Sequence, residues 1–205
     1  WDQSGYSVSL SSDGNTVAIG ARWNDGAGIG IDAGHVRVYQ YNGSTWNQLG
    51  NDIDGESAYD WSGYSVSLSS DGNTVAIGAP PINGNSNGFG YVRIYNYNST
   101  SWSQIGQDID GDEYVWIGYS VSLSSDGNTV AIGIPVTPNE ISKVKIYDYN
   151  GSSWIQIGQD IDGEAAGDMT GYSVSLSSDG NTVAIGTPYN DATDAGHVRI
   201  YNWAG

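Results

Sequence analysis

A string of sixteen residues, GYSVSLSSDGNTVAIG, occurs four times without change and constrains this chain more than any other feature. The copies begin at Gly5, Gly63, Gly118 and Gly171, so they lie 58, 55 and 53 residues apart. Repetition at such a period indicates stacked structural units, each of which covers its neighbour. The spacing predicts units over residues 5–57, 63–112, 118–165 and 171–205 of one domain.

Each unit is predicted to consist of β-strands. In the first unit, Ser7–Leu10 alternates polar and apolar residues, and Thr16–Ile19 is rich in β-branched residues. The Asp-Gly pair between them predicts a two-residue hairpin turn of type I′, which needs positive φ at both positions. Val36–Tyr41 and Trp46–Leu49 are the expected third and fourth strands. No segment has helical periodicity, so we expect an all-β fold.

Four-stranded units of this length are typical of the blades of a β-propeller. The last unit stops after its third strand, at Trp203, so its outer strand is missing and a sheet edge is exposed. Either another copy of the chain covers this edge, or the polypeptide continues beyond Gly205. Because the chain starts at Trp1 and not at a methionine, we expect a processed product or an excerpt of something longer. A closed ring and an open stack of four blades both fit the sequence.

The units resemble FG-GAP-type propeller repeats. The resemblance rests on a Gly-aromatic start, a strand that ends in IGAP at Ile77–Pro80, and a following Gly-x-Val-x-x-Tyr strand. The order of strands also resembles that of WD-repeat blades. FG-GAP repeats carry an aspartate-rich calcium loop between their first two strands, and here that loop is shortened to SSDGN. The resemblance therefore implies a propeller fold but no calcium site in this loop.

Composition excludes several classes of function. The formal net charge is −17, with 23 acidic and 6 basic side chains, so we expect no binding to nucleic acid or to anionic membranes. The chain has no cysteine, which excludes disulfides and thiolate metal sites. No apolar run approaches the roughly 18 residues of a membrane span.

Three Asn-x-Ser/Thr sequons occupy the same place in successive units, the turn between the third and fourth strands. They begin at Asn42, Asn98 and Asn150. A turn on the outer rim is exposed, as an N-glycan requires, so the sequons predict a glycosylated protein that is extracellular or at the cell surface. The alternative is that Asn-Gly simply makes a good turn.

Acidic residues follow each complete unit at spacings of two. They are Asp52, Asp54 and Glu56, then Asp108, Asp110 and Asp112, then Asp160, Asp162 and Glu164. Such carboxylates can turn inward on calcium, although an acidic connector that caps turn amides explains them as well. Calcium is the one cofactor that the sequence suggests.

Basic and aromatic residues also recur with the units. Arg37, Arg93, Lys145 and Arg199 are expected to form ion pairs between blades, with a ring of cations along the channel as the alternative. Trp46, Trp102 and Trp154 keep one position in the repeat, which predicts packing between blades. Trp23, Trp61 and Trp116 depart from the repeat and are candidates for exposed contacts with a glycan or a neighbouring subunit.

We find no catalytic motif. His35 and His197 stand where the other units have Tyr91 and Lys143, so neither has the unique environment of a catalytic base. The sequence has no zinc-binding histidine pair, phosphate loop or nucleophile elbow. We therefore expect a protein that is not an enzyme.

Two functions fit these observations. The first is a self-assembling structural protein that forms a filament or surface coat through its unfilled blade edge. The second is an adhesive or carbohydrate- or protein-binding propeller. Its site would lie in the loops between second and third strands, which differ where everything else repeats, at Arg22–Asp32, Pro80–Gly90, Ile134–Ser142 and Thr187–Ala195.

Overall fold

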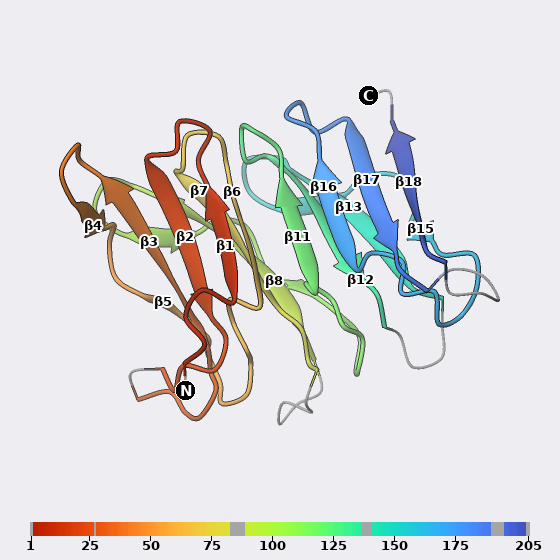
Figure 1. Cartoon of the computed structure of the whole chain (residues 1–205), viewed down its shortest axis with the longest axis horizontal. Coiled ribbons are helices and arrows are strands. Elements are labelled where there is room, and N and C mark those ends of the chain that lie inside the picture. The colour runs from red at the N-terminus through yellow and green to blue at the C-terminus, as the bar shows by residue number, and fades with distance from the viewer. Residues whose placement is uncertain (1, 27, 83–88, 137–140, 190–194, 204–205) are drawn as a thin grey trace.

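The computed structural model describes residues 2–26, 28–82, 89–136, 141–189 and 195–203, and all regular elements in them are β-strands (Figure 1). The first blade contains β1 (Ser7–Leu10), β2 (Thr16–Ala21), β3 (His35–Tyr41), β4 (Trp46–Gln48) and β5 (Ile53–Asp54). The second contains β6 (Ser65–Leu68), β7 (Thr74–Ala79), β8 (Tyr91–Tyr97), β9 (Trp102–Gln104) and β10 (Ile109–Asp110). The third contains β11 (Ser120–Leu123), β12 (Thr129–Ile134), β13 (Lys143–Tyr149), β14 (Trp154–Gln156) and β15 (Ile161–Asp162). The last contains β16 (Ser173–Leu176), β17 (Thr182–Thr187) and β18 (His197–Asn202).

Every blade is an antiparallel meander, in the order that the sequence predicts. In the first blade the order is β1-β2-β3-β4, and the last blade has three strands among the described residues, which confirms that its outer strand is missing from them. The sequence did not reveal β5, β10 and β15. Each of these two-residue strands pairs with the third strand of its blade, as the fourth strand does, but nearer to the start of that strand: Ile53 pairs with Val36 on β3.

The hairpin between the first two strands differs from the predicted type I′ turn. Only Gly14 has positive φ (71°), whereas Asp13 does not. The Asp13 carboxylate accepts hydrogen bonds from the Ser11 hydroxyl (2.6 Å) and the Asn15 amide (2.9 Å), and the Gly14 amide donates to the Ser11 carbonyl (3.0 Å). The Asp13 side chain thus caps its own turn, and only glycine takes the left-handed position in it.

Neighbouring blades meet through a contact that only glycine allows. A side chain on Gly78 would overlap the Gly118 carbonyl oxygen of the next blade, and the Ser65 hydroxyl donates to that same oxygen (2.7 Å). Gly20 and Gly133 lie against the following blade in the same way. The Gly-Tyr-Ser start and the Ile-Gly end of the repeat are therefore two halves of one contact.

Apolar side chains fill the space between the sheets. Val66 and Leu68 of the second blade pack with Val36 and Val38 of the first, and all four are at most 9% exposed. The same set recurs between the second and third blades and between the third and fourth. Each blade thus has one face for the blade before it and another for the blade after it.

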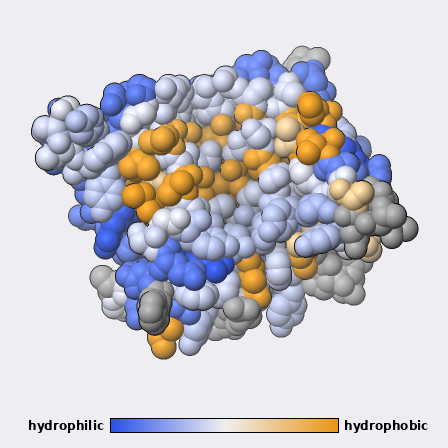
Figure 2. Space-filling view, viewed as in Figure 1, coloured by the Kyte–Doolittle hydropathy of each residue, from blue (hydrophilic) through white to orange (hydrophobic). Residues whose placement is uncertain are grey.

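The four blades form an open arc. Val8 and Leu10 on β1 are 64% and 61% exposed, and Val198 and Ile200 on β18 are 68% and 71% exposed. In Figure 1 the first and last sheets both lie toward the viewer, and Figure 2 shows apolar surface over both of them. The question of ring or stack is thereby answered for the described residues: the arc does not close on itself.

Candidate functional site

The two free sheet faces at the ends of the arc are the main candidate interface. We call them the first-blade face, with Val8 and Leu10, and the last-blade face, with Val198 and Ile200. Val8 and Leu10 of the first-blade face hold the same repeat positions as Val66 and Leu68, which pack against the first blade. Val198 and Ile200 of the last-blade face hold the same repeat positions as Val36 and Val38, which pack against the second blade. The two faces are therefore the two sides of an interface that the chain forms three times internally.

Polar groups at the ends of the arc match in the same way. Across the internal interfaces, the Leu68 amide donates to the Ser9 hydroxyl (2.9 Å), and the Leu123 amide donates to the Ser67 hydroxyl (2.9 Å). The corresponding groups at the two ends are the Leu10 amide and the Ser175 hydroxyl. Among the described residues, a side chain on Gly186 would meet only Ser173 at close range, because no following blade covers it.

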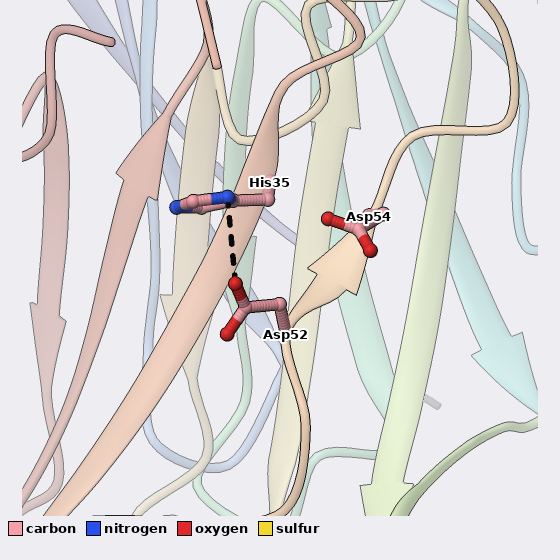
Figure 3. A group of neighbouring side chains, drawn as sticks. All are labelled: His35, Asp52 and Asp54. Atoms are coloured by element: carbon pink, nitrogen blue, oxygen red, sulfur yellow. Dashed lines mark ion pairs between the residues drawn. The ribbon is translucent and has the colours of Figure 1, made fainter. Parts of the chain in front are cut away.

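His35, Asp52 and Asp54 form a second candidate site (Figure 3). Their potential ligand atoms lie within 4.8 Å of one another, and they are the one such group among the described residues. The Nδ1 atom of His35 lies 3.7 Å from Asp52 Oδ2. Burial lowers the pKa of His35, and burial together with the charge of Asp52 raises the pKa of Asp54.

A protein cation already pairs with Asp52 of this group and with its counterpart in the third blade, Asp160. The Arg37 guanidinium donates to both oxygens of Asp52 (2.8–3.0 Å), and these bonds lower the pKa of Asp52. In the third blade, the Lys143 ammonium group lies 3.4 Å from Asp160. The geometry therefore favours a repeated ion pair over a metal centre, and the suggested calcium sites have no further support.

The other acidic residues of the connectors are dispersed over several roles. Asp108 accepts from Arg93 (2.6 Å), while Glu56 and Glu164 pair with Arg93 and Arg199 of the next unit (2.8 and 2.9 Å). Asp54, Asp110 and Asp162 end the short strands β5, β10 and β15, and Asp112 is exposed. Pairing between units is thus confirmed for Arg93 and Arg199. It is wrong for Arg37 and Lys145, whose acidic partners Asp52 and Asp160 belong to their own units.

A row of four tyrosines runs across the inner strands. Tyr6, Tyr64, Tyr119 and Tyr172 precede β1, β6, β11 and β16, and successive ring centroids are 5.0–5.1 Å apart. Burial, together with the hydrogen bond to Tyr172, raises the pKa of Tyr119 to about 12. The Arg22 guanidinium covers the first ring at 3.7 Å from its centroid.

The three tryptophans outside the repeat join this row. Trp23 lies 6.1 Å from Trp61, and Trp116 stacks on Tyr119 at 5.9 Å. Trp61 is only 5% exposed, so the expectation of an exposed contact is wrong for it; the ring packs on Trp23 and beneath Arg22. Trp23 and Trp116 are half-buried. The variable loops beside this row fall partly outside the described residues, at 27, 83–88, 137–140 and 190–194.

The three sequon turns share one geometry and are exposed. The Asn42 side-chain oxygen accepts from the Ser44 amide (3.0 Å) and hydroxyl (2.9 Å), and Asn98 and Asn150 bind Thr100 and Ser152 in the same way. Both sequon side chains therefore stabilise the turn, which gives the motif a structural role whether or not a glycan is attached.

Ser99 has positive φ (75°) where the other two turns have glycine, Gly43 (96°) and Gly151 (93°). A left-handed conformation costs a non-glycine residue about 1–2 kcal/mol. We expect Ser99→Gly to raise the free energy of unfolding by about 0.5 kcal/mol, since added chain entropy offsets part of the gain. Urea denaturation measures it, and the sequon is preserved. Gly43→Ser is the control and should destabilise; equal effects of both changes would contradict the argument.

None of the protein-family models matches the chain, and no curated protein does either. Solved structures do match. A putative 6-phosphogluconolactonase from Bacteroides uniformis is 13% identical, with a TM-score of 0.62 over 96% of this chain and 49% of that one. The β-propeller domain of the Trilobed protease from Pyrococcus furiosus is 11% identical, with a TM-score of 0.52 over 94% of this chain and 53% of that one.

An ancestral GH74 enzyme is 20% identical, with a TM-score of 0.53 over 95% of this chain and 26% of that one. At such identities the likeness shows the fold alone, which is a β-propeller of several blades. The chain spans about half or less of the length of these three structures. The activities named for these proteins are theirs and are not assigned to this chain. None of the described residues forms a helix that could span a membrane.

Proposed function

We propose that this chain is a non-catalytic structural repeat protein that assembles with its own copies head to tail, through its two free sheet faces and not through the unfilled blade edge that the sequence suggested. The observation that carries the proposal is the match between the first-blade and last-blade faces. A surface whose complement lies elsewhere on the same molecule favours heterologous assembly, which makes rings or filaments. Exposed apolar patches rimmed by polar residues are typical of such interfaces.

The contact between copies is expected to repeat the internal contact. The last-blade face of one chain would cover Val8 and Leu10 of the next, and Gly186 would lie against the Gly5 carbonyl. Burial of apolar surface supplies the driving force, and the serine-to-amide hydrogen bonds fix the register. We therefore expect an interface with the packing of a protein core.

The arrangement of the ends favours a closed pair of chains as the assembly unit. Both free faces lie on the same side of the molecule (Figures 1 and 2), so a second chain turned about a two-fold axis would meet both of them. Such a pair would have eight blades. The alternative is a filament, which forms if the rotation from one copy to the next does not bring the chains back into a closed ring.

The assembly is tested by sedimentation of the purified 205-residue chain with and without Gly186→Ala. The added methyl group would overlap the next copy, while among the described residues of its own chain it meets only Ser173 closely. We expect a species of twice 21.7 kDa for the unchanged chain and a folded monomer for the variant.

A second variant and a control make the test specific. Ile200→Lys places a charge on the last-blade face and should also give monomers. Ile155→Lys, on β14 and 50% exposed, should leave the assembly intact. An unchanged chain that stays monomeric at high concentration contradicts the proposal, and species larger than a pair replace the ring with a filament.

We further propose that the protein is extracellular, that Asn42, Asn98 and Asn150 carry glycans and that the repeats are of FG-GAP type. Exposure of all three turns supports the first two points. Glycans there would coat the outer rim and leave the end faces free. Mass spectrometry of native material before and after glycosidase treatment tests occupancy at each site.

A second candidate function is ligand binding at the tyrosine row. The observation that favours it is that the indole N–H groups of Trp23 and Trp61 are buried and have no acceptor among the described residues. Buried donors ordinarily find partners, and aromatic rings with unfilled donors suit a carbohydrate. Binding of the monomeric Gly186→Ala variant to a glycan array would support this function.

A further inference from the structure

A groove of about 480 Å³ lies between the third and last blades, where the last blade lacks its fourth strand. Ile157, Gly158 and Gln159 line one side, and Tyr201, Asn202 and Trp203 line the other. The groove is separate from the two end faces, because it runs along the outer edge of β18. Between the first and second blades, and between the second and third, a side chain of the later blade fills the corresponding place. These two contacts show which side chain the groove can accept.

In both filled positions a tryptophan from the fourth strand lies against the connector of the preceding blade. The Trp102 indole N–H donates to the Leu49 carbonyl (2.8 Å), and the Trp154 indole N–H donates to the Ile105 carbonyl (2.9 Å). The corresponding carbonyl in the groove is that of Ile157. The acceptor for a third indole is therefore in place.

The residue after each of these carbonyls is glycine, and its missing side chain makes room for the ring. A Cβ atom on Gly106 would lie 2.6 Å from the Trp154 ring, and one on Gly50 would lie 3.1 Å from the Trp102 ring. At Gly158 a Cβ atom would meet none of the described residues within 4 Å. The space for the indole exists in all three places and is open in the last.

A glutamine amide holds the backbone of the tryptophan. Gln107 accepts from the Trp154 amide (3.1 Å) and donates to its carbonyl (2.9 Å), and Gln159 holds the same place in the groove. Full engagement buries the ring, since Trp154 is 2% exposed whereas Trp46, which has no preceding blade, is 47% exposed.

We infer that this groove binds an extended Trp-x-Gln segment of a partner polypeptide, paired antiparallel with β18. In the third blade Trp154 pairs with Tyr149 and Gln156 with Tyr147, so the bound tryptophan and glutamine should pair with Trp203 and Tyr201. Backbone hydrogen bonds along a free edge give affinity, and the pocket for one side chain gives specificity. The inference goes beyond the proposed assembly, which uses the sheet faces and not this edge.

Fluorescence anisotropy with a labelled peptide, GSSWIQIGQ, which copies residues 151–159, tests the inference. Gly186→Ala serves as the host, so that self-assembly does not change the size of the complex whose anisotropy is measured. We expect saturable binding, and binding at least about tenfold weaker for the peptide with Trp→Ala, as for a central aromatic anchor.

Gly158→Ala in the same host should weaken binding at least about tenfold, because its methyl group occupies the place of the ring. Gly43→Ala is the matched control, since both glycines have positive φ and open surroundings, and it should leave binding unchanged. Failure of the peptide to bind, or equal binding of its Trp→Ala form, overturns the inference. Either result leaves the sedimentation test of assembly unaffected.

Discussion

Gly78→Ala should destabilise the chain by about 4 kcal/mol or more, the range of exceptional single changes. The new Cβ atom would overlap the Gly118 carbonyl oxygen and the Ser65 hydroxyl. A hydroxyl can rotate away, but the carbonyl belongs to the backbone of the next blade. The second and third blades would have to separate, which would also expose the apolar cluster between them. Urea denaturation followed by circular dichroism measures the loss.

Gly186→Ala is the matched control for this prediction. The residue occupies the same position of the repeat, and its φ is not positive, so alanine fits the strand. The close contact of its Cβ atom is with the Ser173 hydroxyl, which can move. We expect a loss of about 1 kcal/mol or less in the monomer. Similar losses at both positions would show that glycine serves the strand itself and not the contact between blades.

This pair of variants also shows what the sequence can and cannot predict. The repeat predicts the strands, their order and the missing outer strand, because period-2 patterns and turn residues are local signals. It cannot predict exposure, since identical residues differ with their neighbours: Val8 is 64% exposed and Val66 is 9% exposed. Two complementary faces stay exposed because the first blade has no blade before it and the last blade has none after it in the arc. The residues of a single blade do not show which of its faces is covered.

Other differences have equally specific causes. Ile53–Asp54 is too short to show a strand pattern, and it becomes a strand only by pairing with β3. Trp61 lies in a connector, where sequence suggests exposure, but Arg22 and Trp23 from another loop cover it. For the candidate site, the sequence identified the repeated acids and bases, but its prediction of pairing between units is right for Arg93 and Arg199 and wrong for Arg37 and Lys145. Glu56 and Asp108 meet on Arg93 only after two units have stacked.

Arg93→Met should destabilise the chain by about 3 kcal/mol, whereas Arg37→Met should cost about 1 kcal/mol or less. The Arg93 side chain is 7% exposed and pairs with Asp108 (2.6 Å) and Glu56 (2.8 Å), but the Arg37 side chain is 42% exposed. Most of the cost comes from the half-buried Asp108, which would keep its charge without its partner. Glu56 contributes little, because its own side chain is 68% exposed.

The pH dependence of the Arg93→Met variant separates this charge effect from lost packing. Burial opposes ionisation of Asp108, yet hydrogen bonds from Arg93 and Gln104 hold its pKa below the ordinary value. A depressed pKa in the folded state stabilises the protein above the unfolded pKa of about 4 and stops doing so as the pH falls through the folded value. The difference in stability between the unchanged chain and the variant should therefore shrink below about pH 4. A difference that stays constant from pH 7 to pH 3 would assign the loss to packing of the Arg93 side chain on Tyr91 instead.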